Sequence, residues 1–384
     1  MTVLEKIYAG GFSAYLHGYG AIDSWLGVKE TGNNVFIFTN AGTADLAKLF
    51  EDLRFPGVDL ADAALNEKNH TWYFRCADSF KDYHPSFSLL EFYRDCKSRV
   101  FNDPRGIYPV LKEIRNNIKT GKESIKPPQI ITESFNNNSN FNRTLSDAAL
   151  ILAKYIPAAY VNDTKIKKYI NEIKALFDNL SENSAPCPEE QRIFLCELIT
   201  AANPGLGFEL LKTCGFIKKF WPELSFLEQA DHSKEYHPEG NAWEHTMETF
   251  RHRKTSTYDF RLSLGLLLHD MGKPIASSAG NNRYDGHAEL GEIQAHRFLE
   301  RLGFNSSIIR DVCFLVKNHM LPAALPRLPV YRTSEIMSSP LFPLLMELYR
   351  CDESSSFKGL DGYYESSATY QQFLRNKRNP WRKH

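Results

Sequence analysis

The stretch that decides the fold of the second half of this chain is Leu262–Pro274, LSLGLLLHDMGKP. It opens as an apolar run, and His269 and Asp270 stand directly at the end of that run. A carboxylate at the end of a buried helix carries a heavy desolvation cost unless a cation or hydrogen-bond donors face it. A divalent metal ion meets this need, because imidazole and carboxylate groups are both suitable ligands. Gly272 then allows the helix to stop, and Lys273 follows where an anionic substrate could reach it.

Four more candidate ligands lie where neighbouring helices would converge. His245 precedes the pair by about one helix and a turn, His287 opens a helix with a small, apolar side, and His319 and Asp352 stand at the inner ends of two further apolar stripes. A single histidine on an apolar stripe is more often a hydrogen-bonded core residue than a ligand. Four histidines and two aspartates at the inward ends of successive helices favour a metal site instead.

The first 125 or so residues have a different pattern. Val35–Phe38 is a short apolar run bounded by turn residues, as in a buried strand, and Thr71–Cys76 is aromatic and β-prone. Thr43–Phe50 has helical spacing. This block is therefore predicted to be α/β or α+β. A polar segment follows, and from residue 144 onward the apolar spacing is helical.

Composition limits the class of protein. The chain has 384 residues, too many for one ordinary domain, and its 46 basic and 46 acidic residues give a formal net charge of zero. This balance excludes a globally basic nucleic-acid coat, although local patches stay possible. No apolar run reaches the roughly 18 residues of a membrane span, and the first residues do not resemble a signal peptide. Seven cysteines without a Cys-x-x-Cys pair argue against a disulfide framework and a cysteine-type zinc site. A cytoplasmic location is expected.

The series His245, His269-Asp270, His287, His319, Asp352 resembles the HD phosphohydrolase superfamily, in its extended form with two extra histidines. The surroundings resemble the helical neck and HD domain of bacterial tRNA nucleotidyltransferases and poly(A) polymerases. This second resemblance covers most of residues 190–352 and rests on Ala202–Gly205, Phe220–Leu224, His237–Thr246, Leu268–Pro274 and Gly286–Gly291.

The same family begins with a polymerase-β-like nucleotidyltransferase head, and Gly18–Gly27 resembles its opening Gly-Gly-x-x-Arg-Asp motif. Asp23 fits this motif, but Ile22 stands where the family has its arginine. The Asp-x-Asp motif that holds Mg²⁺ falls on a strand where Asn34 and Phe36 replace both acids. Two-metal phosphoryl transfer needs such carboxylates, so the head is predicted not to transfer nucleotides. The alternative is that the alignment is shifted and other acids serve.

The resemblance therefore implies a multidomain α+β protein in which a small mixed α/β head precedes an all-α neck and an all-α HD domain. The predicted function is a metal-dependent phosphohydrolase acting on phosphomonoesters or phosphodiesters of nucleotides or RNA ends, with an inactive head. The alternative is a non-catalytic RNA-binding or regulatory paralogue of tRNA nucleotidyltransferases. The predicted segments are the head (1–125), a polar linker or loop (126–143), the neck (144–225), the HD domain (226–355) and a basic C-terminal tail (356–384), whose end is either a solvated end or a phosphate-binding arm.

The resemblance also implies roles for single residues. His245, His269, Asp270 and Asp352 would hold one divalent ion, and Asp270 would bridge to a second ion held by His287 and His319. The ions would be Mn, Ni, Co, Fe, Zn or Mg. His269, Asp270 and Lys273 are the predicted catalytic residues, and Lys273 with Arg283 would bind the substrate. The expected partner is a phosphoester or nucleotide substrate, RNA or tRNA is left open as a further partner, and no membrane is expected.

Overall fold

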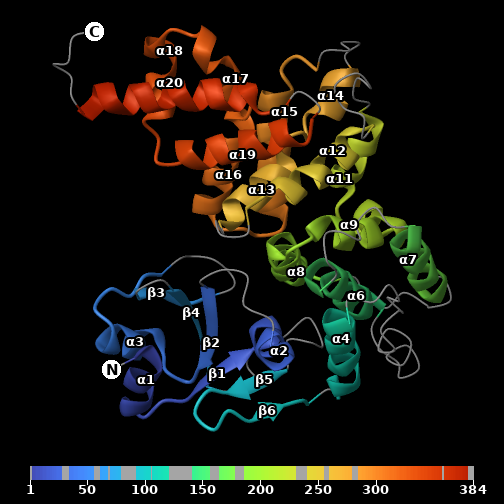
Figure 1. Ribbon diagram of the computed structural model, residues 1–384, viewed down its shortest axis with the longest axis vertical. Coiled ribbons are helices and arrows are strands. Elements are labelled where there is room, and N and C mark those ends of the chain that lie inside the picture. Colours follow the sequence, from blue (N-terminus) through green and yellow to red (C-terminus); the bar gives the residue numbers. More distant parts are fainter. Residues whose placement is uncertain are drawn as a thin grey trace. The chain divides into compact units, whose positions relative to one another are not determined.

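A computed structural model shows the chain as two compact units, Met1–Cys214 with Thr255–Tyr258, and Gly215–Lys254 with Asp259–His384 (Figure 1). The structure describes the whole chain except residues 1, 28–33, 56–60, 68–69, 79–91, 105, 121–140, 156–163, 178–185, 231–239, 255–258, 279–283, 357–358 and 379–384.

The first unit contains a six-stranded mixed sheet in the order β3-β4-β2-β1-β5-β6. The neighbouring strands β2 and β4 are parallel, and the other pairs are antiparallel. The strands are β1 (Ala14–His17), β2 (Asn34–Thr39), β3 (Ala63–Glu67), β4 (His70–Cys76), β5 (Tyr93–Asp95) and β6 (Phe101–Asn102).

Helices α1 (Val3–Ala9) and α3 (Thr43–Leu49) pack on one face of this sheet (Figure 1). Their apolar residues form one core with alternate strand residues, because successive side chains of a strand point to opposite faces. The core includes Ile7 and Leu46 from the helices, and Ile37 and Phe74 from the strands. The sheet face that carries Phe36 is therefore the opposite one.

Among the described residues, the remaining helices of the first unit are α2, directly after β1, and five helices that follow the sheet. Gly207 allows two of them, α6 and α9, to approach closely, since a Cβ at this position would lie 2.8 Å from the carbonyl oxygen of Ala149. The helices are α2 (Gly18–Leu26), α4 (Tyr108–Thr120), α6 (Phe141–Tyr155), α7 (Thr164–Phe177), α8 (Pro188–Thr200) and α9 (Pro204–Thr213).

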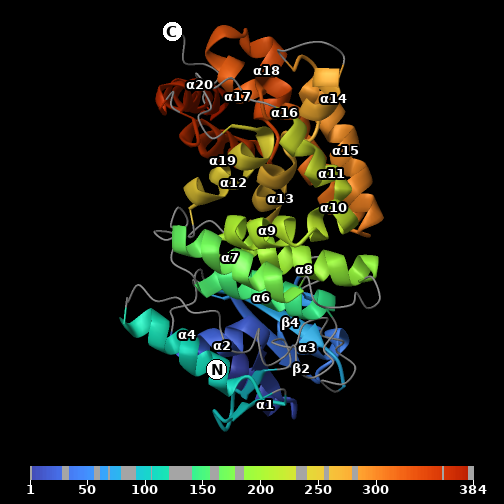
Figure 2. The same cartoon turned by 90° about the vertical axis from the view of Figure 1, so that its right-hand side faces the viewer.

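The described part of the second unit is entirely helical (Figure 2). Its α-helices are α10 (Phe216–Phe220), α11 (Pro222–Ser225), α12 (Ala242–Thr249), α13 (Phe260–Leu268), α14 (Lys273–Ser278), α15 (His287–Arg301), α16 (Ser306–Asn318), α17 (Leu321–Ala324), α18 (Val330–Met337), α19 (Phe342–Ser354) and α20 (Asp361–Arg378). Three short 3₁₀ helices join some of them: η3 (Phe226–Gln229), η4 (Phe250–His252) and η5 (Leu325–Arg327).

The mixed α/β composition and the helical second half are confirmed among the described residues. Val35–Phe38 and Thr71–Cys76 lie in β2 and β4, and Thr43–Phe50 corresponds to α3. Most of the predicted linker, residues 126–140, lies outside the described residues, and α6 already begins at Phe141. Across the described ranges, no helix is both long enough and apolar enough to cross a membrane.

The segment predicted as a basic tail is mostly helix α20, and residues 379–384 lie outside the described part. The prediction of a tail is corrected because α20 has an apolar side that packs on the unit. The rings of Tyr370 and Phe342 lie 4.5 Å apart, and the buried Ser366 hydroxyl donates to the carbonyl of Pro322. Lysine and arginine on the opposite side of a packed helix give the same composition as a frayed end.

His17, at the end of β1, makes the stability of the protein depend on pH. Burial, with a smaller contribution from Arg75, lowers the pKa of His17 to about 4. The unfolded chain therefore binds a proton near pH 6.5 that the folded chain does not yet accept, so stability falls as the pH falls through this window. We expect the lowered pKa of His17 to reduce the free energy of unfolding by about 2 kcal/mol when the pH falls from 7 to 5.

The measurement is urea unfolding at both pH values for the natural protein and for His17→Gln. On acidification, the free energy of unfolding of His17→Gln should fall by about 2 kcal/mol less than that of the natural protein. His70→Gln, which changes an exposed histidine of β4, is the control and should keep the natural pH dependence. Equal pH dependence in the natural protein and His17→Gln would contradict the assignment.

Candidate metal centre

Six histidine and aspartate side chains converge in the second unit from helices α12, α15 and α19 and from the positions directly after α13 and α16. They form two groups, and within each group the possible ligand atoms lie within 4.8 Å of one another. The first group is His245, His269 and Asp352, and the second is Asp270, His287 and His319. All six residues that the sequence predicted as ligands are thus brought together.

The ends of helices position these side chains. His269 directly follows the buried residues Leu262–Leu268 of α13, and His319 directly follows the last residue of α16, so both lie at the C-terminal end of a core helix. Gly286, with a positive φ of 78°, turns the chain into α15, which begins at His287. Gly272 lies against this turn: a methyl group there would overlap the carbonyl oxygen of His287. The contact explains why a glycine follows the His-Asp pair so closely.

One ring nitrogen of each of three histidines is held by a backbone carbonyl. Nδ1 of His269 lies 2.8 Å from the oxygen of Leu266, Nδ1 of His287 lies 2.8 Å from that of Tyr284, and Nδ1 of His319 lies 2.7 Å from that of Val316. A carbonyl only accepts, so each Nδ1 must carry the proton and donate it. In the neutral ring Nε2 then has a free electron pair, the state of a histidine ready to bind a metal.

These electron pairs face one another. Nε2 of His287 and Nε2 of His319 are 3.0 Å apart, and two acceptors at that distance repel unless a cation lies between them. Nε2 of His269 is buried and has no hydrogen-bond partner in the described part of the chain. Burial lowers the pKa of His269, and it lowers the pKa of His319 to about 3, so these two rings are neutral at neutral pH and do not supply this cation.

The two carboxylates supply negative charge at the same place. Although burial opposes ionisation, the neighbouring His269 and Lys273 hold the pKa of Asp270 well below its usual range. A hydrogen bond with His245, at 2.9 Å, likewise outweighs burial and lowers the pKa of Asp352. Oδ1 of Asp270 lies 3.8 Å from Nε2 of His287, so the carboxylate faces the free electron pair of this ring without a hydrogen bond. The four histidines and two aspartates therefore have the chemistry of ligands for divalent metal ions.

The two predicted substrate-binding residues have different outcomes. Lys273 is tied to the site itself, because its Nζ donates to Oδ2 of Asp270 at 2.7 Å. Arg283 lies outside the described residues. The sequence analysis missed Ser355, whose Oγ lies 3.2 Å from Nδ1 of His245 and whose hydroxyl donates to the carbonyl of Asp352. Its spacing three residues after Asp352, one helical turn, is the signal that could have found it.

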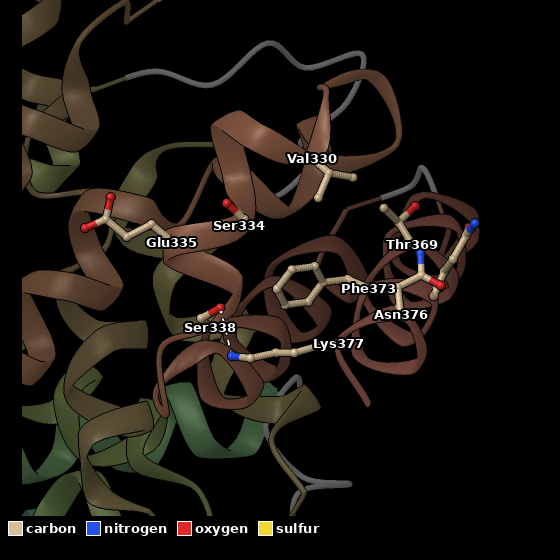
Figure 3. A pocket seen from close by; sticks show the side chains of 9 residues that line it. Val330, Ser334, Glu335, Ser338, Thr369, Phe373, Asn376 and Lys377 are labelled. Carbon is tan, nitrogen blue, oxygen red and sulfur yellow. Dashed lines mark hydrogen bonds between the residues drawn. The ribbon is translucent and has the colours of Figure 1, made fainter. Parts of the chain in front are cut away.

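A separate groove of about 610 Å³ lies between α18 and α20 (Figure 3). The ring of Phe373 and the side chain of Lys377 project into it, and Nζ of Lys377 donates to Oγ of Ser338 at 3.1 Å. None of the six candidate ligands lines this groove. It is therefore distinct from the metal centre.

Curated proteins, among them the following three, share partial sequence similarity with this chain. The multifunctional CCA protein of Shewanella denitrificans is 27% identical over 124 residues, 32% of this chain and 30% of that protein. The CC-adding tRNA nucleotidyltransferase of Thermus thermophilus is 30% identical over 152 residues, 38% of this chain and 35% of that protein. The multifunctional CCA protein of Alkalilimnicola ehrlichii is 29% identical over 171 residues, 44% of this chain and 40% of that protein. The similarity thus spans less than half the length of these relatives. No family model matches.

Several solved structures align with nearly the whole chain at low similarity, and two of them illustrate this. One is a tRNA nucleotidyltransferase complexed with a primer tRNA and an incoming ATP analog, with 14% identity, a TM-score of 0.37, and coverage of 98% of this chain and 99% of that chain. The other is a CCA-adding enzyme with ATP, with 13% identity, a TM-score of 0.37, and coverage of 98% and 81%. Superpositions this loose carry no argument about function.

The names of the curated relatives overturn the predicted function. They describe CCA proteins and a tRNA nucleotidyltransferase, so the prediction of an HD-type phosphohydrolase with an inactive nucleotidyltransferase head is wrong. The error had a physical cause. A set of metal ligands specifies that an ion is bound, but it does not specify which reaction the ion serves. The catalytic roles predicted for His269, Asp270 and Lys273 stay predictions.

Proposed function

We propose that this protein is a metal-binding tRNA nucleotidyltransferase, which adds nucleotides to the end of a tRNA. The observation that supports the reaction is the 30% identity over 152 residues with a protein named for CC addition to tRNA. In this proposal the unit with the sheet contains the head and the neck helices α6–α9. The partners are tRNA and nucleoside triphosphates.

The second part of the proposal is that the two groups of ligands bind divalent metal. His245, His269 and Asp352 hold one ion, and Asp270, His287 and His319 hold a second. The supporting observation is that Nε2 of His287 and Nε2 of His319 lie 3.0 Å apart, although both rings carry their proton on Nδ1. Imidazole-rich sites favour Mn, Fe, Co, Ni or Zn over Mg. A bound ion would supply positive charge that neutralises the buried carboxylates and can bind an oxygen atom of a ligand.

Within the first unit we propose Asp23 as a residue needed for transfer. Transfer of a nucleotide from a nucleoside triphosphate to a 3′ hydroxyl, with pyrophosphate as the leaving group, requires carboxylates that hold metal ions. Strand β2 offers none, because Asn34–Thr39 contains no acid. Asp23 lies on α2, directly after β1, and Oδ1 accepts a hydrogen bond of 3.0 Å from the hydroxyl of Tyr155. This bond fixes the carboxylate between the sheet-bearing part and helix α6. Burial raises the pKa of Asp23, an effect that Lys154 opposes.

The test is incorporation of labelled CTP or ATP into a tRNA lacking its 3′ end, with Mg²⁺ or Mn²⁺ present. We expect incorporation by the natural protein and a loss of at least about ten-fold, or about 1.4 kcal/mol, in Asp23→Asn. The asparagine of this variant keeps a side-chain oxygen that can accept the hydrogen bond from the Tyr155 hydroxyl. Asp52→Asn, at an exposed carboxylate of the same unit, is the matched control and should transfer normally. Absence of incorporation with every nucleotide and metal would overturn the proposed function.

A further inference from the structure

Ser355 lies beside the ring of His245, on the side that faces away from the two aspartates. His245 is on α12, Ser355 directly follows α19, and Oγ of Ser355 is 3.2 Å from Nδ1 of His245. Both residues are buried, with 1% of His245 and 8% of Ser355 exposed. The other ring nitrogen, Nε2, lies 2.9 Å from Oδ1 of Asp352 and 3.9 Å from Oδ2 of Asp270. The hydroxyl and the carboxylates therefore lie on opposite sides of one imidazole ring.

A second contact of the Ser355 hydroxyl fixes the direction of its bond with His245. Oγ of Ser355 is also 2.6 Å from the backbone oxygen of Asp352, and a carbonyl oxygen only accepts. A hydroxyl has one hydrogen, so this hydrogen is donated to the carbonyl and Oγ accepts from the ring. Nδ1 of His245 must therefore carry a proton. The nitrogen that remains to bind a metal ion is Nε2, which faces the carboxylates.

The position of His245 explains why a side chain supplies this acceptor. The other three histidines of the centre donate from Nδ1 to the carbonyl three residues earlier, which lies at the end of a helix or outside one. His245 lies inside α12, where the corresponding carbonyl, that of Ala242, belongs to the helix. A helical carbonyl accepts from the amide four residues later, and that of Ala242 also accepts from the hydroxyl of Thr246 at 2.7 Å. The acceptor for His245 comes from another helix instead.

We propose that Ser355 is a positioning residue of the metal centre, which accepts the Nδ1 proton of His245 and so directs Nε2 of this ring to the ion. The inference rests on the metal binding of the proposed function and deepens it. It concerns one of the two ions, because His245 and Asp352, the partners of the Ser355 hydroxyl, both belong to the group with His269. Partners that hold the second nitrogen of a ligating histidine contribute about ten- to a hundred-fold to metal affinity.

The experiment compares Co²⁺ binding by the natural protein and by Ser355→Ala, which removes the acceptor and leaves all six ligands in place. The visible absorption of bound Co²⁺ gives the number of ions and the affinity for each. We expect the affinity for one ion to fall by about ten- to a hundred-fold and the affinity for the other to stay unchanged. A substitution that only loosened the fold would weaken both ions and would lower the temperature of thermal unfolding.

Ser354→Ala is the matched control. Ser354 is the preceding residue, and its hydroxyl donates to the carbonyl of Arg350 at 2.6 Å. This variant therefore loses the same kind of bond between a serine and the backbone of α19, but it keeps the partner of His245. It should bind both ions as the natural protein does.

The Nδ1 proton gives a second readout, which needs no metal. In protein with isotope-labelled histidine, the ring N–H resonance of His245 is identified as the one missing from His245→Gln. A ring proton that donates a hydrogen bond resonates at lower field than one that does not. The resonance should therefore move upfield in Ser355→Ala and keep its position in Ser354→Ala.

The possible failures are distinguishable. Equal affinities for both ions in Ser355→Ala and the natural protein would overturn this inference alone, as would an equal loss of both ions or the same loss in Ser354→Ala. A natural protein that binds no Co²⁺ would overturn the proposed metal binding and this inference with it. Absence of nucleotide incorporation, together with Co²⁺ binding that depends on Ser355, would overturn only the proposed transfer reaction.

Discussion

Asp270→Ala is expected to remove most of the divalent metal that the purified protein binds. This carboxylate belongs to the group with His287 and His319, and its Oδ2 also lies 3.4 Å from Nε2 of His269 in the other group. Its removal takes away the negative charge that balances an ion in a fully buried site. We expect metal affinity to fall by at least about a hundred-fold, more than the loss of an outer-shell partner causes. Elemental analysis after reconstitution with Mn²⁺, Ni²⁺ or Zn²⁺ gives the number of bound ions.

Helix α15 offers a matched pair of histidines as a control. His287→Ala should reduce the number of bound ions, whereas His296→Ala should not, because His296 is 54% exposed and faces Glu300 at 3.7 Å. Both variants change the same residue type on the same helix. A natural protein that binds no metal after reconstitution would show that the two groups are not a metal centre. Equal metal content in Asp270→Ala and the natural protein would exclude Asp270 as a ligand.

Gly272→Ala is expected to destabilise the second unit by about 3 kcal/mol or more. A methyl group there would overlap the carbonyl oxygen of His287 and would lie 2.5 Å from the amide nitrogen of Gly291. Both atoms belong to the backbone of α15, so no flexible side chain can move aside. The start of α15 must shift instead, and His287 shifts with it. The affinity for metal should therefore fall, and the urea concentration at the midpoint of unfolding should fall with it.

Gly20→Ala provides the comparison for this substitution. Gly20 lies in helix α2, and no heavy atom comes within 4 Å of its added Cβ. Alanine is a better helix former than glycine by up to about 1 kcal/mol, so this variant should be as stable as the natural protein or slightly more stable. Equal stability of Gly272→Ala and Gly20→Ala would mean that the contact between Gly272 and α15 is not as tight as the structure has it.

The sequence was sufficient to predict which side chains form the candidate metal centre. His269 and Asp270 follow an apolar helix, and His319 ends an apolar stripe, so the burial of these three followed from local spacing alone. Asp352 ends another apolar stripe, and its side chain is 22% exposed. The pairing among them could not be predicted. The contact of His245 with Asp352 joins positions 107 residues apart, and the orientation of each ring depends on carbonyl groups that only the folded chain brings near.

In the sheet, the strands could be predicted from the sequence but their pairing could not. Local pattern located β2 and β4, but not that they pair side by side in parallel, since that register depends on the path of the chain between them. The sequence analysis consequently treated Phe36 only as a missing acid. Its stacking on Tyr73 became visible when the register placed the two residues opposite each other.

The 2.9 Å approach of His245 to Asp352 has a consequence for the durability of the chain. An ion bound to both residues would close a loop of more than one hundred residues, as a crosslink does, and loops of this length lose about 4–5 kcal/mol of entropy in the unfolded chain when they are covalently closed. A protease cut inside that loop would then leave two fragments that the ion still holds together. Cleaved protein would migrate as one species under native conditions and separate only when a chelator removes the metal.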